Sequence, residues 1–354
     1  MGFGNFIAGL TAKTLGERQG NGLRAKRAKD LATDPELPQK EYQAARESLL
    51  GKDFGSDPAL NACTPCAANA KAARRAQRLD LVGRGVQGCP DHAANAARLR
   101  SDMDEVEHAR LAKHVYVKYD KDAPDDLKVP PPGYLDASPE ELGQLGLRQG
   151  MLTPEGTDFR AAVYKKDPLV WGEGAGPPYE VVFRGSTLVQ EDWDNNFAQN
   201  ADKESSYYEK AVGIGNAISE KDASENVQIV GHSLGGGLAS AAQGGSGAVA
   251  TTFNAAGLNP QTVARYSKLP DRQQADASKI LAYQVEGEVL TSTQEKGMLS
   301  NFSNPSVGQR NIVPPSSTEL SSDDRHAMDE VIKAIESRKT ADETAIKDCL
   351  KNKA

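Results

Sequence analysis

The stretch Val227-Gln-Ile-Val-Gly-His-Ser-Leu-Gly-Gly-Gly-Leu238 joins a short apolar run to a segment of small residues through a serine between glycines. The pattern Gly231-x-Ser233-x-Gly235, directly after a strand and before a helix, is typical of a nucleophile elbow. Glycine is needed on both sides of the serine because strand and helix backbones crowd together there. We therefore predict a reactive serine at position 233. A glycine-rich turn with an idle serine is the alternative.

On both sides of this turn, apolar runs rich in β-branched residues alternate with helix-forming segments. This order predicts an α/β protein. The middle strands are apolar almost throughout, which is typical of a sheet covered by helices on both faces. The expected strands are 159–164, 179–183, 227–230, 250–253 and 280–285, and the expected helices are 206–219, 234–243, 260–268 and 323–337.

Two further segments accompany the serine turn. One is Tyr179-Glu-Val-Val-Phe-Arg-Gly-Ser-Thr187, followed by Asp192-Trp193, and the other is Phe253-Asn-Ala-Ala-Gly-Leu258. With the Gly-His-Ser-Leu-Gly-Gly run they make the chain similar to the class 3 lipase family of α/β-hydrolases. The resemblance implies an α/β-hydrolase core and hydrolysis of acyl esters by a serine nucleophile.

The resemblance also implies a place for the oxyanion hole, the donors that stabilise the negative oxygen of the reacting ester. One donor is expected at Ser186, which follows Phe-Arg-Gly. The other is the backbone N–H of Leu234, the residue after the nucleophile. Each such donor contributes about 2.7–4 kcal/mol to transition-state stabilisation. A simple strand-ending turn is the alternative for residues 184–186.

A serine nucleophile needs a base, and in α/β-hydrolases the chain order is Ser, then acid, then His. His326 is the sole histidine after Ser233, so we predict that it is the base. A solvated histidine at the start of a helix is the alternative. His232 adjoins the serine, and we expect its side chain to point away from the active face and to serve packing. The remaining histidines, His92, His108 and His114, precede the expected sheet.

The acid that orients the base is expected near the end of a strand between Ser233 and His326. The segment Ile280-Leu-Ala-Tyr-Gln-Val-Glu-Gly-Glu-Val289 offers two carboxylates there. Similar lipases carry Asp in a Gly-Asp-Pro-Val type sequence, and the matching residue here is Glu288. Hydrolase triads use either carboxylate. Glu286 would point the same way along an extended strand, so it stays open as the acid, and both residues could also be surface charges.

Residues 1–105 differ in composition from the rest of the chain. They are rich in Ala, Arg and Lys and poor in β-branched residues. This composition favours helix. We therefore expect a helical N-terminal head over 1–105 and an α/β-hydrolase lipase domain over 106–354. Near the junction, residues 115–119 are expected to adopt an extended conformation. Residues 291–314 are expected to form a flexible segment bordering the site.

The head contains Cys63-Thr-Pro-Cys66 and Cys89-Pro-Asp-His92, two close pairs whose residue types and spacing resemble a zinc site. Cys63, Cys66, Cys89 and His92 are therefore candidate ligands of a structural zinc ion. With Cys349 the chain has four cysteines, which also permits disulfides in an oxidising compartment. Free thiols are the third alternative. No cofactor is needed for the predicted serine chemistry.

The composition excludes several classes of protein. The 42 Lys and Arg against 49 Asp and Glu give a net charge of −7, which argues against a nucleic-acid binder. No run approaches the ~18 apolar residues that a transmembrane helix needs. The first residues lack the basic head of a secretory signal peptide. We expect synthesis in the bacterial cytoplasm and export by another route.

A helical head before a hydrolase core, without a secretory signal, resembles the phospholipase effectors that bacteria inject through type VI secretion. That layout implies a membrane phospholipid substrate, a carrier in the secretion apparatus, an immunity protein in the producer and action in the target-cell periplasm. Two alternatives stay open. One is an intracellular carboxylesterase, and the other is a catalytically inactive hydrolase-fold protein that binds a partner.

Overall fold

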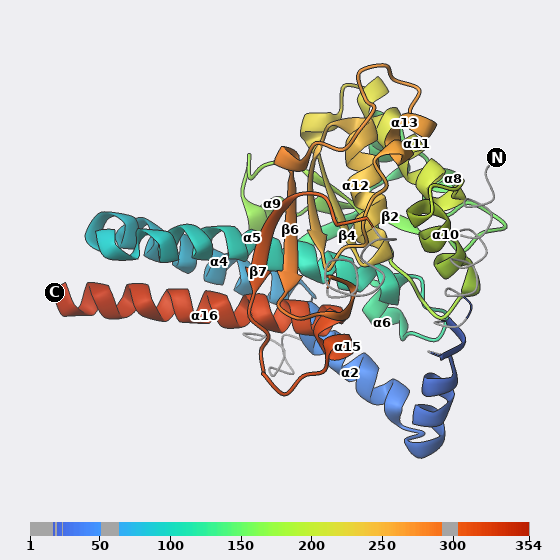
Figure 1. Ribbon diagram of the computed structural model, residues 1–354. Helices are drawn as coiled ribbons and strands as arrows, with labels where there is room; N and C mark the ends of the chain where they lie inside the picture. Colours follow the sequence, from blue (N-terminus) through green and yellow to red (C-terminus); the bar gives the residue numbers. More distant parts are fainter. Residues whose placement is uncertain (1–16, 18–19, 23, 51–63, 292–303, 354) are drawn as a thin grey trace.

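The computed structural model describes residues 17–353, apart from 18–19, 23, 51–63 and 292–303. Its centre is a seven-stranded sheet in which the strands follow one another in chain order (Figure 1). β1, β2 and β3 pair antiparallel, and β3 to β7 run parallel. The strands are β1 (Tyr134–Asp136), β2 (Ala161–Lys166), β3 (Tyr179–Phe183), β4 (Val227–His232), β5 (Val249–Phe253), β6 (Ile280–Val285) and β7 (Gln309–Val313).

Helices connect the parallel strands and cover the sheet, which confirms the predicted α/β-hydrolase class. The longer ones are α2 (Leu37–Leu50), α4 (Thr64–Gly88), α5 (Ala93–Lys118), α10 (Gln190–Asn200), α11 (Ser206–Glu220), α12 (Leu234–Ser246) and α16 (Met328–Lys353). The shorter ones are α6 (Asp125–Lys128), α7 (Pro139–Gln144), α8 (Gln149–Leu152), α9 (Pro168–Trp171), α13 (Gln261–Tyr266) and α15 (Ser322–His326).

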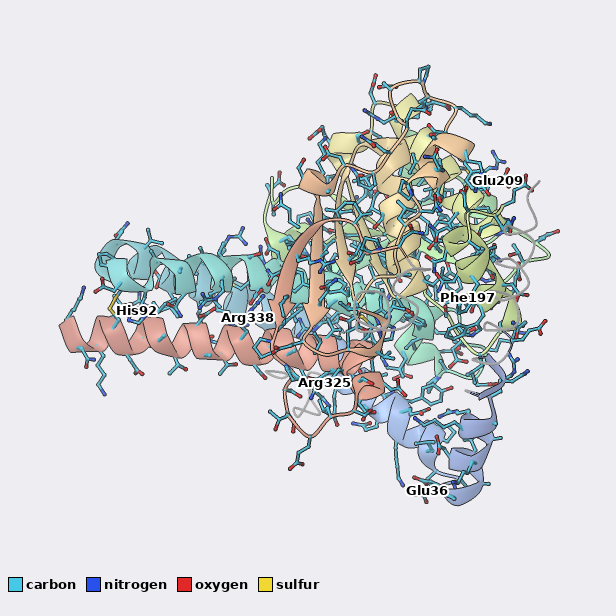
Figure 2. All side chains as sticks on the ribbon, in the orientation of Figure 1. Glu36, His92, Phe197, Glu209, Arg325 and Arg338 are labelled. Carbon is cyan, nitrogen blue, oxygen red and sulfur yellow. A yellow bond between two sulfur atoms is a disulfide. The ribbon has the colours of Figure 1, made fainter. Side chains whose placement is uncertain are left out.

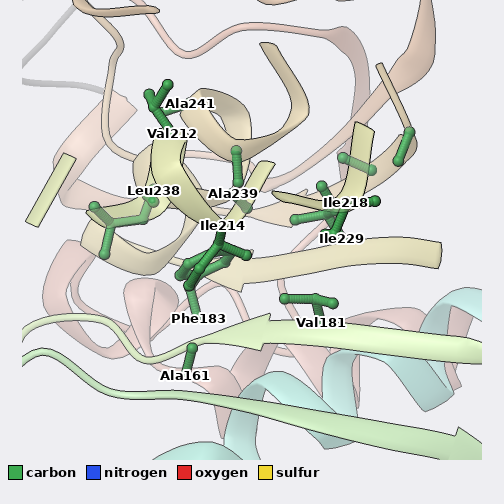
Figure 3. Close-up of a cluster of buried hydrophobic side chains, with 14 of the residues drawn as sticks. Ala161, Val181, Phe183, Val212, Ile214, Ile218, Ile229, Leu238, Ala239 and Ala241 are labelled. Carbon is green, nitrogen blue, oxygen red and sulfur yellow. The ribbon is translucent and has the colours of Figure 1, made fainter. Parts of the chain in front are cut away.

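Alternate residues of each central strand feed two hydrophobic cores, because successive strand side chains point to opposite faces. In β3, Val181 and Phe183 face the core made with α11 and α12, which Figure 3 shows. Val182 of the same strand faces the second core, made with α5 and α16. The sheet is thus buried on both faces, as its apolar strands predict.

The sequence predicted 179–183 and 280–285 to the residue, and it missed two edge strands. β1 is three residues long and β7 carries mostly polar residues, so neither has a strong strand pattern. The extended conformation expected for 115–119 is wrong. α5 continues through Val115 and Val117 to Lys118. Val115 is fully buried in the second core, and such packing overrides the weak helix propensity of valine.

α4, α5 and α16 run side by side and project beyond the sheet as a three-helix arm (Figure 1). Ion pairs join its helices, with Arg98 2.6 Å from Asp342 and Arg338 2.7 Å from Asp102. The expected boundary between 105 and 106 lies inside α5, which is continuous there. A division into a head and a separate hydrolase domain therefore stays a proposal.

A disulfide joins Cys89, just before α5, to Cys349 near the end of α16. It lies at the far end of the arm, beside His92 (Figure 2). Cys66 is also disulfide-bonded, while Cys63 lies outside the described residues. The zinc interpretation of this cysteine set is therefore wrong for Cys89 and Cys66, because a sulfur in a disulfide is not the thiolate that binds zinc.

The segment expected to be flexible, 291–314, is described only in part. Residues 292–303 lie outside the described residues, so that expectation stays untested for them. Residues 309–313 form β7, which pairs in parallel with β6. For this end of the segment the expectation is wrong.

Candidate active site

Ser233 lies between β4 and α12, at the sharp turn that the sequence predicts. Its backbone has φ 57° and ψ −128°, a conformation that a non-glycine residue adopts only under strain. A Cβ at Gly231 would stand 2.0 Å from the carbonyl oxygen of Gly235. The close approach of strand and helix therefore requires glycine at position 231. The turn holds the Ser233 side chain partly exposed among buried neighbours.

Ser233, His326 and Glu288 come together in one hydrogen-bonded chain. Ser233 Oγ lies 3.0 Å from His326 Nε2, and His326 Nδ1 lies 2.7 Å from Glu288 Oε2. An ionised carboxylate only accepts, so Nδ1 of His326 carries the proton and Nε2 is free to accept from the serine hydroxyl. The three residues follow β4, β6 and β7, whose carboxyl ends meet at one edge of the parallel sheet.

Glu288 is fully buried, and backbone groups hold its carboxylate. Leu290 N–H donates to Oε2 at 2.8 Å, and Thr291 N–H donates to Oε1. Burial of the carboxylate raises the pKa of Glu288. The hydrogen bond from His326, the charge of His326 and the hydrogen bonds from Thr291 lower it, and the net pKa lies below its ordinary value. Glu286 is exposed, and its backbone carbonyl accepts from Arg325. Of the two candidate acids, only Glu288 contacts His326 in the residues described.

The Ser186 loop lies directly beside the elbow. A Cβ at Gly235 would stand 2.3 Å from the carbonyl oxygen of Phe183, so the end of β3 packs against the start of α12. Leu234 is the first residue of α12, and the N–H groups of a first helical turn have no partner within the helix. Asp192 accepts from both the N–H and the hydroxyl of Thr187, which fixes the loop after Ser186.

Sequence reasoning missed two residues behind His326. His232, expected only to pack, places its Nε2 2.8 Å from the carbonyl oxygen of His326. Asn254, which follows β5 with φ 41°, donates to the same carbonyl at 3.1 Å. The positions were visible as part of Gly-His-Ser and Phe-Asn-Ala, but nothing in the sequence indicates a bond to a residue 94 positions away.

Neither a metal site nor a membrane span is found among the residues that the structure describes. No group of three or more His, Cys, Asp or Glu side chains there is arranged to hold a metal ion. No described helix combines the length and apolar character needed to cross a bilayer.

Comparison with known proteins assigns the chain to a family. Residues 107–316 match the family of Tle-like phospholipase domains. The chain is also 32% identical over 243 residues to an extracellular phospholipase A1 of Serratia liquefaciens, and this alignment covers 66% of the chain and 70% of the relative. Both findings agree with the lipase resemblance seen in the sequence. The chain therefore belongs to the Tle-like phospholipase family.

Proposed function

We propose that the protein is a serine phospholipase that hydrolyses acyl ester bonds of membrane phospholipids. The observation that carries this proposal is the chain from Ser233 through His326 to Glu288 on a strained elbow. Membership of the Tle-like phospholipase family and the similarity to a phospholipase A1 support the substrate class and an A-type specificity.

The geometry supports a two-step acyl transfer. Ser233 Oγ attacks the ester carbonyl carbon while His326 Nε2 takes the hydroxyl proton, and Glu288 stabilises the resulting imidazolium. The backbone N–H groups of Ser186 and Leu234 donate to the oxyanion. His326 then protonates the departing alcohol oxygen, which leaves an acyl group on Ser233. Water, deprotonated by His326, releases the fatty acid and restores the serine.

Lipid mass spectrometry on bacterial membranes tests this function. Wild-type protein should release fatty acid and lysophospholipid, and Ser233→Ala should release neither. The isomer of the lysophospholipid identifies the ester position that is cut. Hydrolysis of a short-chain ester without any change in phospholipid would instead support an intracellular carboxylesterase. Equal lipid profiles and no ester hydrolysis in either sample would support an inactive binding protein.

We further propose that the protein is an antibacterial effector that acts in the periplasm of a target cell. The Tle-like family and the helical head support delivery by a secretion-apparatus carrier. The disulfide between Cys89 and Cys349 supports an oxidising destination, because disulfides persist in the periplasm and rarely in the cytoplasm. An immunity protein that covers Ser233 would protect sister cells from such an enzyme.

Growth of bacteria expressing four versions of the protein tests the effector role. Wild type and Ser233→Ala are each produced with and without an added export signal. Only exported wild type should kill, and a cognate immunity protein should restore growth. Equal growth of all four would rule out the effector role while leaving lipid hydrolysis intact. Killing by exported Ser233→Ala would point to a toxic activity that does not use this serine.

A further inference from the structure

A second hydrogen-bonded chain runs behind Ser233 and connects the two sides of the site. His232 Nε2 donates to the carbonyl oxygen of His326 at 2.8 Å, and the Tyr116 hydroxyl lies 3.0 Å from His232 Nδ1. The Tyr116 hydroxyl, from α5, also packs against Gly185, where a Cβ would stand 2.0 Å from the hydroxyl oxygen. Gly185 immediately precedes Ser186. These two hydrogen bonds and this contact therefore connect the backbone of the proposed base to the loop of the proposed oxyanion hole.

The donor and acceptor roles in this chain are fixed by chemistry. A carbonyl oxygen only accepts, so Nε2 of His232 must carry the proton. In a neutral imidazole the other nitrogen is then an acceptor, and the Tyr116 hydroxyl donates to it. Burial, with the neighbouring His326 and Lys113, holds the pKa of His232 well below its ordinary value. His232 is thus a neutral ring in a single tautomer.

The contacts in this chain leave little freedom. A Cβ at Gly185 would stand 2.0 Å from the Tyr116 hydroxyl oxygen and 2.5 Å from the carbonyl oxygen of His232. The rings of His232 and His326 lie 4.9 Å apart between centroids. Any displacement of Tyr116 or His232 therefore reaches both the Ser186 loop and the main chain of His326.

We propose that His232 and Tyr116 are positioning residues, which hold His326 and the Ser186 loop at fixed places on either side of Ser233. This inference rests on the proposed serine mechanism. A misplacement of about 1 Å can cost on the order of 10²-fold in rate, so such a support matters even though it touches no substrate.

Three substitutions at His232 separate its two hydrogen bonds. Gln keeps a donor at the place of Nε2, Asn keeps only a group at the place of Nδ1, and Phe keeps neither. We measure hydrolysis of p-nitrophenyl butyrate. His232→Asn and His232→Phe should each lower kcat at least about tenfold with little change in KM. A tenfold loss corresponds to about 1.4 kcal/mol of transition-state stabilisation. His232→Gln should recover most of kcat. Tyr116→Phe should lower kcat several-fold.

A second buried His–Tyr pair provides the matched control. His114, also on α5, places Nδ1 2.8 Å from the Tyr164 hydroxyl in the second core. His114→Phe and Tyr164→Phe should lower the melting temperature as much as His232→Phe and Tyr116→Phe, but should leave kcat per folded molecule unchanged. Equal kcat losses in the two pairs would mean that His232 acts only through stability, and would overturn the inference.

Nitrogen-15 NMR of the wild-type protein tests the same inference without any substitution at His232. His232 should give the signals of a neutral Nε2–H imidazole between pH 5 and 9. A ring protonated on Nδ1 or titrating in this range would overturn the inference. Ser233→Ala keeps the two proposals apart. Unchanged hydrolysis in Ser233→Ala defeats the serine mechanism, whereas lost hydrolysis with full activity in His232→Asn defeats only the positioning role.

Discussion

Glu288 and His326 are 38 residues apart in the chain, yet Glu288 Oε2 lies 2.7 Å from His326 Nδ1. The carboxylate is fully buried, while the histidine side chain keeps 21% of its surface exposed. The buried Glu288 thus fixes the orientation of the His326 ring from one side, while Nε2 on the other side of the ring faces Ser233. This arrangement defines which substitutions should impair catalysis and which should not.

Glu288→Gln should lower kcat about 10³- to 10⁴-fold, because an amide no longer stabilises the imidazolium that forms when His326 takes the serine proton. Glu286→Gln is the matched control, two residues away and exposed, and should keep near wild-type activity. Steady-state hydrolysis of a short-chain ester measures both. Comparable losses in the two variants would mean that neither carboxylate is the acid that orients His326.

Ser233→Ala and His326→Ala should each lower kcat by about 10⁵- to 10⁶-fold, and the double variant should lose little more, because the two side chains act as a unit. Ester hydrolysis by the single and double variants, with circular dichroism to verify folding, measures this coupling. Losses that multiply in the double variant would contradict a shared catalytic role.

The Cys89–Cys349 disulfide should stabilise the fold without affecting the chemistry. It closes a loop across 260 positions, so removing it frees a large amount of chain entropy in the unfolded state. We expect Cys89→Ser/Cys349→Ser to lower the free energy of unfolding by about 2–5 kcal/mol in urea titrations, with activity at 25 °C retained. His92→Ala, beside the disulfide, is the control and should change stability little. Equal stability of both variants would show that the bond adds nothing.

Stability should fall at alkaline pH through His108. Burial disfavours its charge, but Glu180 and Glu105 raise the pKa of His108 to about 10. Its charged form therefore stabilises the fold fully below the unfolded value near 6.5, and this contribution is lost as the pH rises toward 10. Between pH 7 and 10 the wild-type free energy of unfolding should fall by up to about 1.4 kcal/mol per pH unit more steeply than that of His108→Gln. Parallel curves from urea titrations would contradict this assignment.

The sequence alone predicted the elements with strong local signals. The glycines around Ser233 predicted its turn because only they permit the close approach of β4 and α12. The apolar runs 179–183 and 280–285 predicted β3 and β6. The position of His326 followed from the chain order of the resembling family. These features depend on residues near one another in the chain or on a resemblance, so they could be read without coordinates.

Tertiary structure decided what depends on distant segments. Glu288 and Glu286 are alike in sequence, and only the turn after β6 buries Glu288 against His326. By sequence alone, Cys89 could be a metal ligand or part of a disulfide. The packing of α16 on α5 brings Cys349 beside it and decides for the disulfide. Residues 115–119 have strand-like composition, yet α5 continues through Lys118, because Val115 is buried against the sheet. The bond from His232 to the His326 carbonyl likewise arises where segments 94 residues apart meet, and local sequence carries no signal for such a meeting.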